Sequence, residues 1–133
     1  MWLNWWLNDS RADKASMPTF QNKGNYLLVE FREPFSLEMM ISAVHEALRQ
    51  CEEQNLTKAL ADLRNMPGNP SMLDRHQIGI EIAKTWGPRI KAALILRPES
   101  LSHMTENTAV NRGANLLSTS DVAHALEWLG VTG

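Results

Sequence analysis

Residues 90–96, IKAALIL, and residues 58–63, KALADL, decide the fold of this 133-residue chain. Each is a short, nearly continuous apolar run, which is typical of a strand buried on both faces of a parallel sheet. Ser71 and Asp74 lie between them at the spacing of a capping box, and they predict a helix that ends near Trp86. A strand, a helix and a second strand in this order predict a parallel pair joined by a right-handed crossover.

The segment before this unit predicts a hairpin and a helix. Residues 19–23 and 26–31 are strand-like and flank a turn at Gly24, which suits a tight antiparallel hairpin. Apolar residues then recur at three- and four-residue steps from Ser36 to Cys51. We therefore expect an amphipathic helix with Ser36 as its N-cap.

The segment after this unit continues the alternation of strands and helices. A third helix is expected from Pro98 to a stop at Gly113, followed by a short strand over residues 115–118 and a last helix capped by Ser120. The predicted order is β-β-α-β-α-β-α-β-α. It predicts one α/β domain over residues 17–133, with a single mostly parallel sheet of about five strands, an N-terminal antiparallel hairpin and about four helices.

Composition and charge exclude several classes of protein. Hydrophobic residues make up 44% of the chain and charged residues 21%, as in an ordinary globular domain. The formal net charge is −2, which gives no electrostatic basis for binding nucleic acid. No apolar run is long enough to span a membrane, and the single cysteine, Cys51, suits a reducing compartment. We expect a cytoplasmic protein with no nucleic-acid partner and no integral membrane segment.

Residues 1–16, MWLNWWLNDSRADKAS, differ from the rest of the chain because they hold three of its five tryptophans. On a helix, Trp2, Trp5 and Trp6 would share one face and form a short amphipathic anchor. One interpretation is an arm that docks on its own domain, on a second copy in a homodimer, or on a bilayer surface. The other interpretation is an upstream extension of a true start at Met17.

Four short motifs carry a resemblance to a known family. They are LADLR at 60–64, Ser71 followed by Asp74 and Arg75, KAALIL at 91–96, and Glu106 with NRG at 111–113 before a strand and a helix ending in ALEWL at 125–129. With these motifs, the chain from about residue 19 to 129 resembles the SpoIIAA-like proteins, relatives of STAS and SEC14/CRAL-TRIO domains. The resemblance implies an α/β sandwich of about five strands and no established enzymatic role.

The resemblance also implies two modes of function. The best-known relatives are anti-sigma-factor antagonists, in which a partner kinase phosphorylates a serine at the start of the second helix. Ser71 matches that position, where a helix N-terminus stabilises an added phosphate, although the loop at 67–71 (PGNPS) departs from the serine-glycine turn of the family. The alternative is that Ser71 is simply an N-cap. SEC14-type relatives instead bind apolar ligands between sheet and helices.

A second candidate site is a group of polar residues near the carboxyl ends of the predicted strands, where open α/β sheets bind ligands. Asp62 and Arg64 lie at one such end, Arg97 at another, and Arg75 on the helix that follows. Together they are suited to hold a small anion or carboxylate. The alternative is that an Asp–Arg pair pins the loop.

No catalytic or metal motif is present. The four histidines lack zinc-site spacing, and no phosphate-binding glycine loop or nucleophile elbow occurs. Cys51 falls on an apolar stripe, as a buried hydrophobe would. We therefore expect no catalytic residue, no metal ligand and no cofactor.

Two functions follow from these observations. The preferred one is a non-catalytic regulatory interaction module of STAS type, which docks a protein partner through an exposed surface at residues 66–75. The alternative is a carrier or sensor of a small apolar ligand. It requires a cavity of roughly several hundred Å³ between sheet and helices, for which methionines beside the core, such as Met40, Met66 and Met72, offer an adaptable lining.

Overall fold

The central sheet has five strands in the order β1-β2-β3-β4-β5. The computed structural model describes residues 17–133, so the expectations for residues 1–16 lie outside the described residues. The first two strands are antiparallel and every other neighbouring pair is parallel, which confirms the predicted α/β sheet with an N-terminal hairpin. The strands are β1 (Thr19–Asn22), β2 (Leu27–Glu30), β3 (Lys58–Asp62), β4 (Lys91–Ile95) and β5 (Asn115–Thr119).

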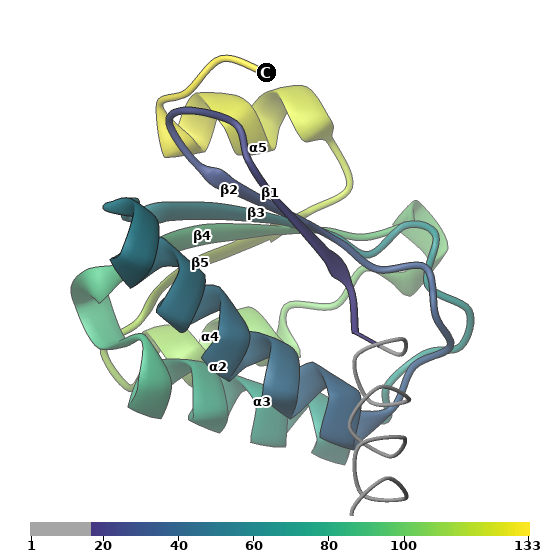
Figure 1. Ribbon diagram of the computed structural model, residues 1–133. Helices are drawn as coiled ribbons and strands as arrows, with labels where there is room; N and C mark the ends of the chain where they lie inside the picture. The colour runs from purple at the N-terminus through teal and green to yellow at the C-terminus, as the bar shows by residue number, and fades with distance from the viewer. Residues whose placement is uncertain (1–16) are drawn as a thin grey trace, which may run out of the picture.

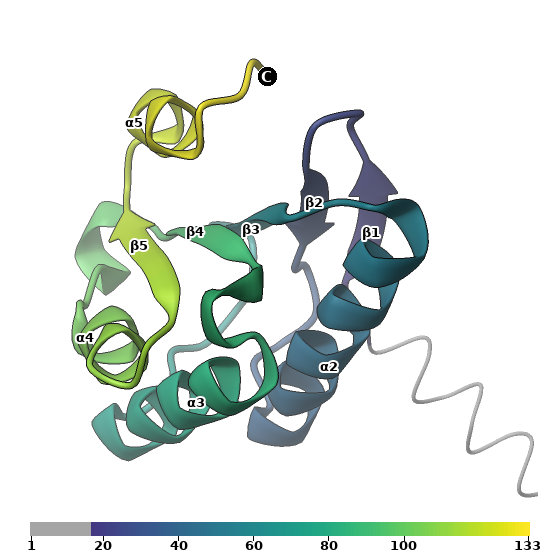
Figure 2. The same cartoon turned by 90° about the vertical axis from the view of Figure 1, so that its left-hand side faces the viewer.

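Three helices cover one face of this sheet and one helix covers the other (Figures 1 and 2). Each crossover from β2 to β5 steps to the next strand in the same direction, and right-handed crossovers of this kind put their helices on one face. The last helix follows the final strand and lies on the opposite face. The α-helices within residues 17–133 are α2 (Leu37–Gln54), α3 (Met72–Thr85), α4 (Met104–Val110) and α5 (Val122–Leu129).

The sheet separates two hydrophobic cores of unequal size. Successive side chains of a strand point to opposite faces, so Val29 and Leu94 join the larger core beneath α2 and α3. Leu60 and Ile95 join the smaller core beneath α5. This alternation decides which polar side chains share a face of the sheet.

The ends of α2 and α3 follow the predicted capping chemistry. The Ser36 hydroxyl accepts a hydrogen bond from the Met39 amide at the start of α2. A capping box joins Ser71 and Asp74 at the start of α3. The Trp86 indole, at the end of α3, donates to the Val44 carbonyl in the middle of α2 at 2.8 Å, which holds the two helices together.

Two helix starts differ from the sequence prediction. Pro98–Ser100 forms a separate 3-10 turn, η2, because the backbone becomes extended at Leu101, and α4 begins only at Met104. The last helix is capped by Asp121 rather than by Ser120, since the Asp121 carboxylate accepts hydrogen bonds from two backbone amides of the first turn. Aspartate and serine are comparable N-caps, so their order in the chain did not decide between them.

Helices α3 and α4 approach closely at Gly79. A Cβ atom placed there would lie 2.7 Å from the Thr108 Cβ and 2.8 Å from the Thr105 carbonyl oxygen. The Thr105 hydroxyl also donates to the Arg75 carbonyl at 3.1 Å. Contact through a glycine therefore holds α4 against the part of α3 that carries Arg75.

No helix within residues 17–133 is both long enough and apolar enough to cross a bilayer.

Candidate functional site

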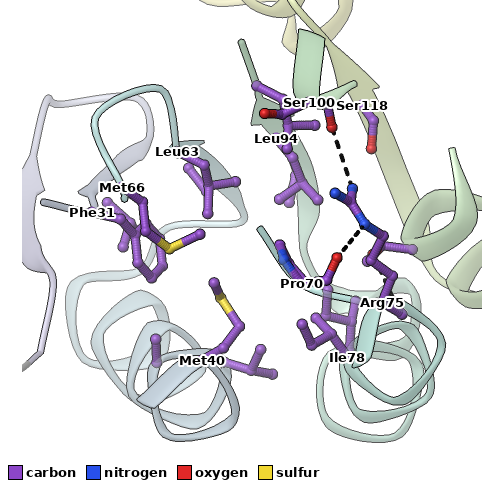
Figure 3. A pocket seen from close by; sticks show the side chains of 18 of the residues that line it. Phe31, Met40, Leu63, Met66, Pro70, Arg75, Ile78, Leu94, Ser100 and Ser118 are labelled. Atoms are coloured by element: carbon purple, nitrogen blue, oxygen red, sulfur yellow. Dashed lines mark hydrogen bonds between the residues drawn. The ribbon is translucent and has the colours of Figure 1, made fainter. Parts of the chain in front are cut away.

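An apolar pocket lies between the sheet and helices α2 and α3 (Figure 3). Its volume is about 70 Å³, and Phe31, Met40 and Ile78 are among the apolar side chains that line it. Gly68 and Asn69 line it as well and belong to an exposed loop, so the pocket reaches the surface beneath that loop. The loop follows β3, which places the pocket at the carboxyl edge of the parallel strands, where ligands of open α/β sheets bind.

Arg75 turns from the first turn of α3 into this pocket and is only 8% exposed. Its Nε donates to the Pro70 carbonyl at 3.2 Å and its Nη1 to the Ser100 carbonyl at 3.4 Å. No carboxylate of residues 17–133 lies within ion-pair distance of its guanidinium. The pocket therefore contains a buried positive charge that has only backbone acceptors.

Ser118 places an unsatisfied hydroxyl on the pocket wall. It lies on β5, is 2% exposed, and has the one buried side-chain N or O atom of the described residues without a hydrogen-bond partner. An unsatisfied buried hydroxyl costs about 1–3 kcal/mol. Figure 3 shows Ser118 and Arg75 on the same side of the pocket, opposite Phe31 and Met66. Ser118 was not among the residues predicted from the sequence, although its place two positions after the apolar Leu116, on the same strand face, indicates a core-facing side chain.

Arg97 borders the pocket and fastens its loop. Its Nη1 donates to the carbonyls of Arg64 and Met66, both at 3.0 Å, and its Nη2 donates to the Ser100 hydroxyl at 3.2 Å. Its Nε lies 3.3 Å from the Glu99 carboxylate. Arg97 is thus a partnered cation, in contrast to Arg75.

Asp62 and Arg64 lie on the opposite face of the sheet. They line an open groove of about 260 Å³ between the hairpin and α5. The Arg64 guanidinium forms two hydrogen bonds of 2.9 Å with the Asp62 carboxylate, and this contact lowers the pKa of Asp62 and raises that of Arg64. The sheet lies between this pair and Arg75. The four polar residues singled out in the sequence therefore do not converge on one site.

Ser71 is exposed and its hydroxyl acts as an N-cap. The hydroxyl accepts from the Asp74 amide at 3.1 Å, and the Asp74 carboxylate accepts from the Ser71 amide at 3.3 Å. A phosphate on Ser71 would be stabilised by the helix N-terminus but repelled by the Asp74 carboxylate. Beside Ser71, Met72 is 58% exposed and Leu73 is 67% exposed, whereas Met66 is buried in the pocket wall.

Groups with nucleophilic or metal-binding chemistry do not gather in the described part of the chain. Burial raises the pKa of the Cys51 thiol to about 11, so it is protonated at neutral pH. No cluster of three or more His, Cys, Asp or Glu residues within 17–133 is placed to hold a metal ion. The described residues that line the pocket include no histidine and no carboxylate.

No protein-family model matches the chain, and no match was found among the curated proteins.

Proposed function

We propose that the chain is a non-catalytic, cytoplasmic domain of the SpoIIAA-like class that carries or senses a small ligand in the apolar pocket. The observation that carries this proposal is the pocket itself. Protein interiors are normally packed to crystal density, yet a space lined mainly by apolar side chains remains between the sheet and two helices and reaches the surface. Pockets of this kind, with a few polar groups, are the usual sites for small molecules.

The volume of the pocket limits the size of the ligand. An engineered cavity of about 150 Å³ binds benzene, and this pocket has about half that volume at about 70 Å³. A ligand with about three or four carbon atoms fits it. Met40 and Met66 line the pocket, and their unbranched side chains can adjust to a somewhat larger molecule.

Further observations support a binding role within the SpoIIAA-like class. General acid–base catalysis needs a group that exchanges a proton near neutral pH, and the polar lining consists of arginine, hydroxyl and amide groups. The sheet of five strands between helices agrees with the α/β sandwich of about five strands that the family resemblance implies. The buried, unpaired thiol of Cys51 supports a cytoplasmic location.

Filling the pocket tests this proposal. Ala43 lines the pocket from α2, and Ala43→Leu adds three carbons to it. We expect native mass spectrometry or thermal-shift titration with small organic molecules to detect a ligand on the wild type and not on Ala43→Leu. Ala83→Leu is the matched control, because Ala83 is half-buried on α3 but does not line the pocket. A wild type that takes up no small molecule in either assay would contradict the proposal.

A second candidate function is a regulatory interaction module that docks a protein partner at the start of α3. Two large apolar side chains, Met72 and Leu73, are exposed there beside Ser71. This is the surface on which a STAS-type partner would dock. If they form that surface, Leu73→Glu abolishes cross-linking to a partner, or to a second copy of the chain, in cell extract. Val110→Glu is the control at an exposed apolar position of α4, and it leaves the cross-linking unchanged. The same cross-linked products from both variants would refute this candidate.

A further inference from the structure

We infer that the ligand of this pocket is a small monocarboxylate, with its carboxylate bound by Arg75 and Ser118 and its apolar body against Phe31 and Met40. The inference rests on the proposed ligand-binding function, to which it adds the head group of the ligand. Both ends of such a molecule have matching groups in Figure 3, since Arg75 and Ser118 lie on one side of the pocket and Phe31, Met40 and Met66 lie across it.

The charge of Arg75 is the first reason. Removing an ion from water is costly, and buried ions are normally offset by an opposite charge. Arg75 is 92% buried, given its 8% exposure, and donates two long hydrogen bonds to backbone carbonyls. A guanidinium has five N–H donors, so three remain for a ligand. A carboxylate supplies the missing charge and accepts from a guanidinium in the planar, two-bond geometry that arginine favours.

Ser118 is the second reason. Its buried hydroxyl lacks a partner within the described chain and lies on the same side of the pocket as the Arg75 side chain. A carboxylate oxygen would accept a hydrogen bond from this hydroxyl. One ligand group thus satisfies two polar side chains that come from different elements, α3 and β5.

The number of charges favours a carboxylate over other anions. Arg97, the other cation that lines the pocket, already contacts Glu99 and four other oxygen acceptors. A phosphate dianion would therefore bury an uncompensated negative charge beside Arg75. An amine would be repelled, and an alcohol or amide would leave the arginine charge unbalanced. A short monocarboxylate matches the single charge. Butyrate has six non-hydrogen atoms, as many as benzene, so the pocket of about 70 Å³ accommodates it when the Met40 and Met66 side chains adjust.

The test compares butyrate with molecules that share its body or its charge. Calorimetry and thermal shift are measured for the full chain with butyrate, butyramide, 1-butanol and inorganic phosphate. We expect binding and a rise in Tm with butyrate alone. Arg75→Met should weaken butyrate binding at least about tenfold, because a hydrogen-bonded charge is lost, and Ser118→Ala should weaken it severalfold. Arg64→Met is the matched control, since it removes the same charge from the opposite face of the sheet and should leave binding unchanged.

The outcomes separate this inference from the proposed function. If butyramide or 1-butanol binds as well as butyrate, and Arg75→Met still binds them, the pocket takes apolar ligands and the carboxylate assignment is overturned. Equal binding of phosphate overturns it too. If none of the four molecules binds and the purified chain holds no small molecule, the proposed function fails as well. Should Arg75→Met not fold, Arg75→Lys, which keeps the charge and loses the planar fork, and Ser118→Ala decide the question: unchanged butyrate affinity in both refutes the inference.

Discussion

Replacing Gly79 with alanine tests the close approach of α3 and α4. In a helix interior, alanine is more stable than glycine by about 1 kcal/mol, so the substitution would stabilise the protein at a site with free space around it. At this site, however, the new Cβ would lie 2.7 Å from the Thr108 Cβ and 2.8 Å from the Thr105 carbonyl oxygen. Neither atom can rotate away, so α4 has to shift as a unit. Overpacking of this kind costs about 1–3 kcal/mol, and with two rigid contacts we expect the upper half of that range.

The net expectation is a loss of about 1–2 kcal/mol in the free energy of unfolding, which corresponds to a Tm lower by roughly 3–8 °C for a domain of this size. Urea unfolding followed by circular dichroism measures it. Gln77→Ala, on the exposed side of the same helix, is the control and should stay within about 0.5 kcal/mol of wild type. The Thr105 hydroxyl bonds the Arg75 carbonyl, so Gly79→Ala should also weaken butyrate binding. A variant as stable as wild type would refute the reasoning.

Three further predictions concern single polar or reactive groups. The Arg64 hydrogen bond is the chief reason that the pKa of Asp62 is lowered in the folded chain. The ionised Asp62 carboxylate therefore stabilises the fold at pH values above 3.8, the ordinary pKa, and this stabilisation is lost as the pH falls through the lower pKa of the folded state. Asp62→Asn should therefore be less stable than wild type at neutral pH in urea titrations, and the difference should shrink in acid; a pH-independent difference would contradict the ion-pair origin. Ser71→Ala should lower the free energy of unfolding by about 1 kcal/mol, measured in the same way, whereas Ser71→Asp should stay close to the wild-type value because aspartate is also a good N-cap. An equal loss of stability in the two variants would refute the capping role. Cys51 should react with a thiol reagent far more slowly in the folded chain than in urea, because burial raises its pKa to about 11; equal rates would show that the thiol is accessible.

The strands and their order could be predicted because the signals are local and the handedness of crossovers is general. The apolar runs that became β3 and β4 needed no knowledge of tertiary contacts. The third helix was predicted to start too early because Pro98 and Ser100 have the chemistry of a helix start. In the fold, the Arg97 side chain bonds the Ser100 hydroxyl within a separate turn, and the backbone extends at Leu101.

The candidate site was harder to predict because it depends on the face of the sheet to which each residue points. Asp62 and Arg75 are both near the carboxyl edge, but the two-residue period of β3 turns Asp62 toward α5, whereas Arg75 reaches the other face from α3. The position of Ser118 on the core-facing side of β5 could be inferred from Leu116, but its lack of a hydrogen-bond partner depends on tertiary contacts. Met72 was predicted to lie beside the core, yet its place in the first turn of α3 leaves it 58% exposed.

The position of α5, alone on its face of the sheet, has a consequence for the order in which the domain unfolds. Only the eight residues of α5 contribute a helix to the smaller core, while α2 and α3 hold the larger one. Local stability follows the number of buried apolar contacts, so a domain of this kind opens in stages. Detachment of α5 would bare Leu60 and Ile95 to water yet leave Arg75 and its surroundings in place, so partial unfolding at the carboxyl terminus and loss of the ligand are separable events.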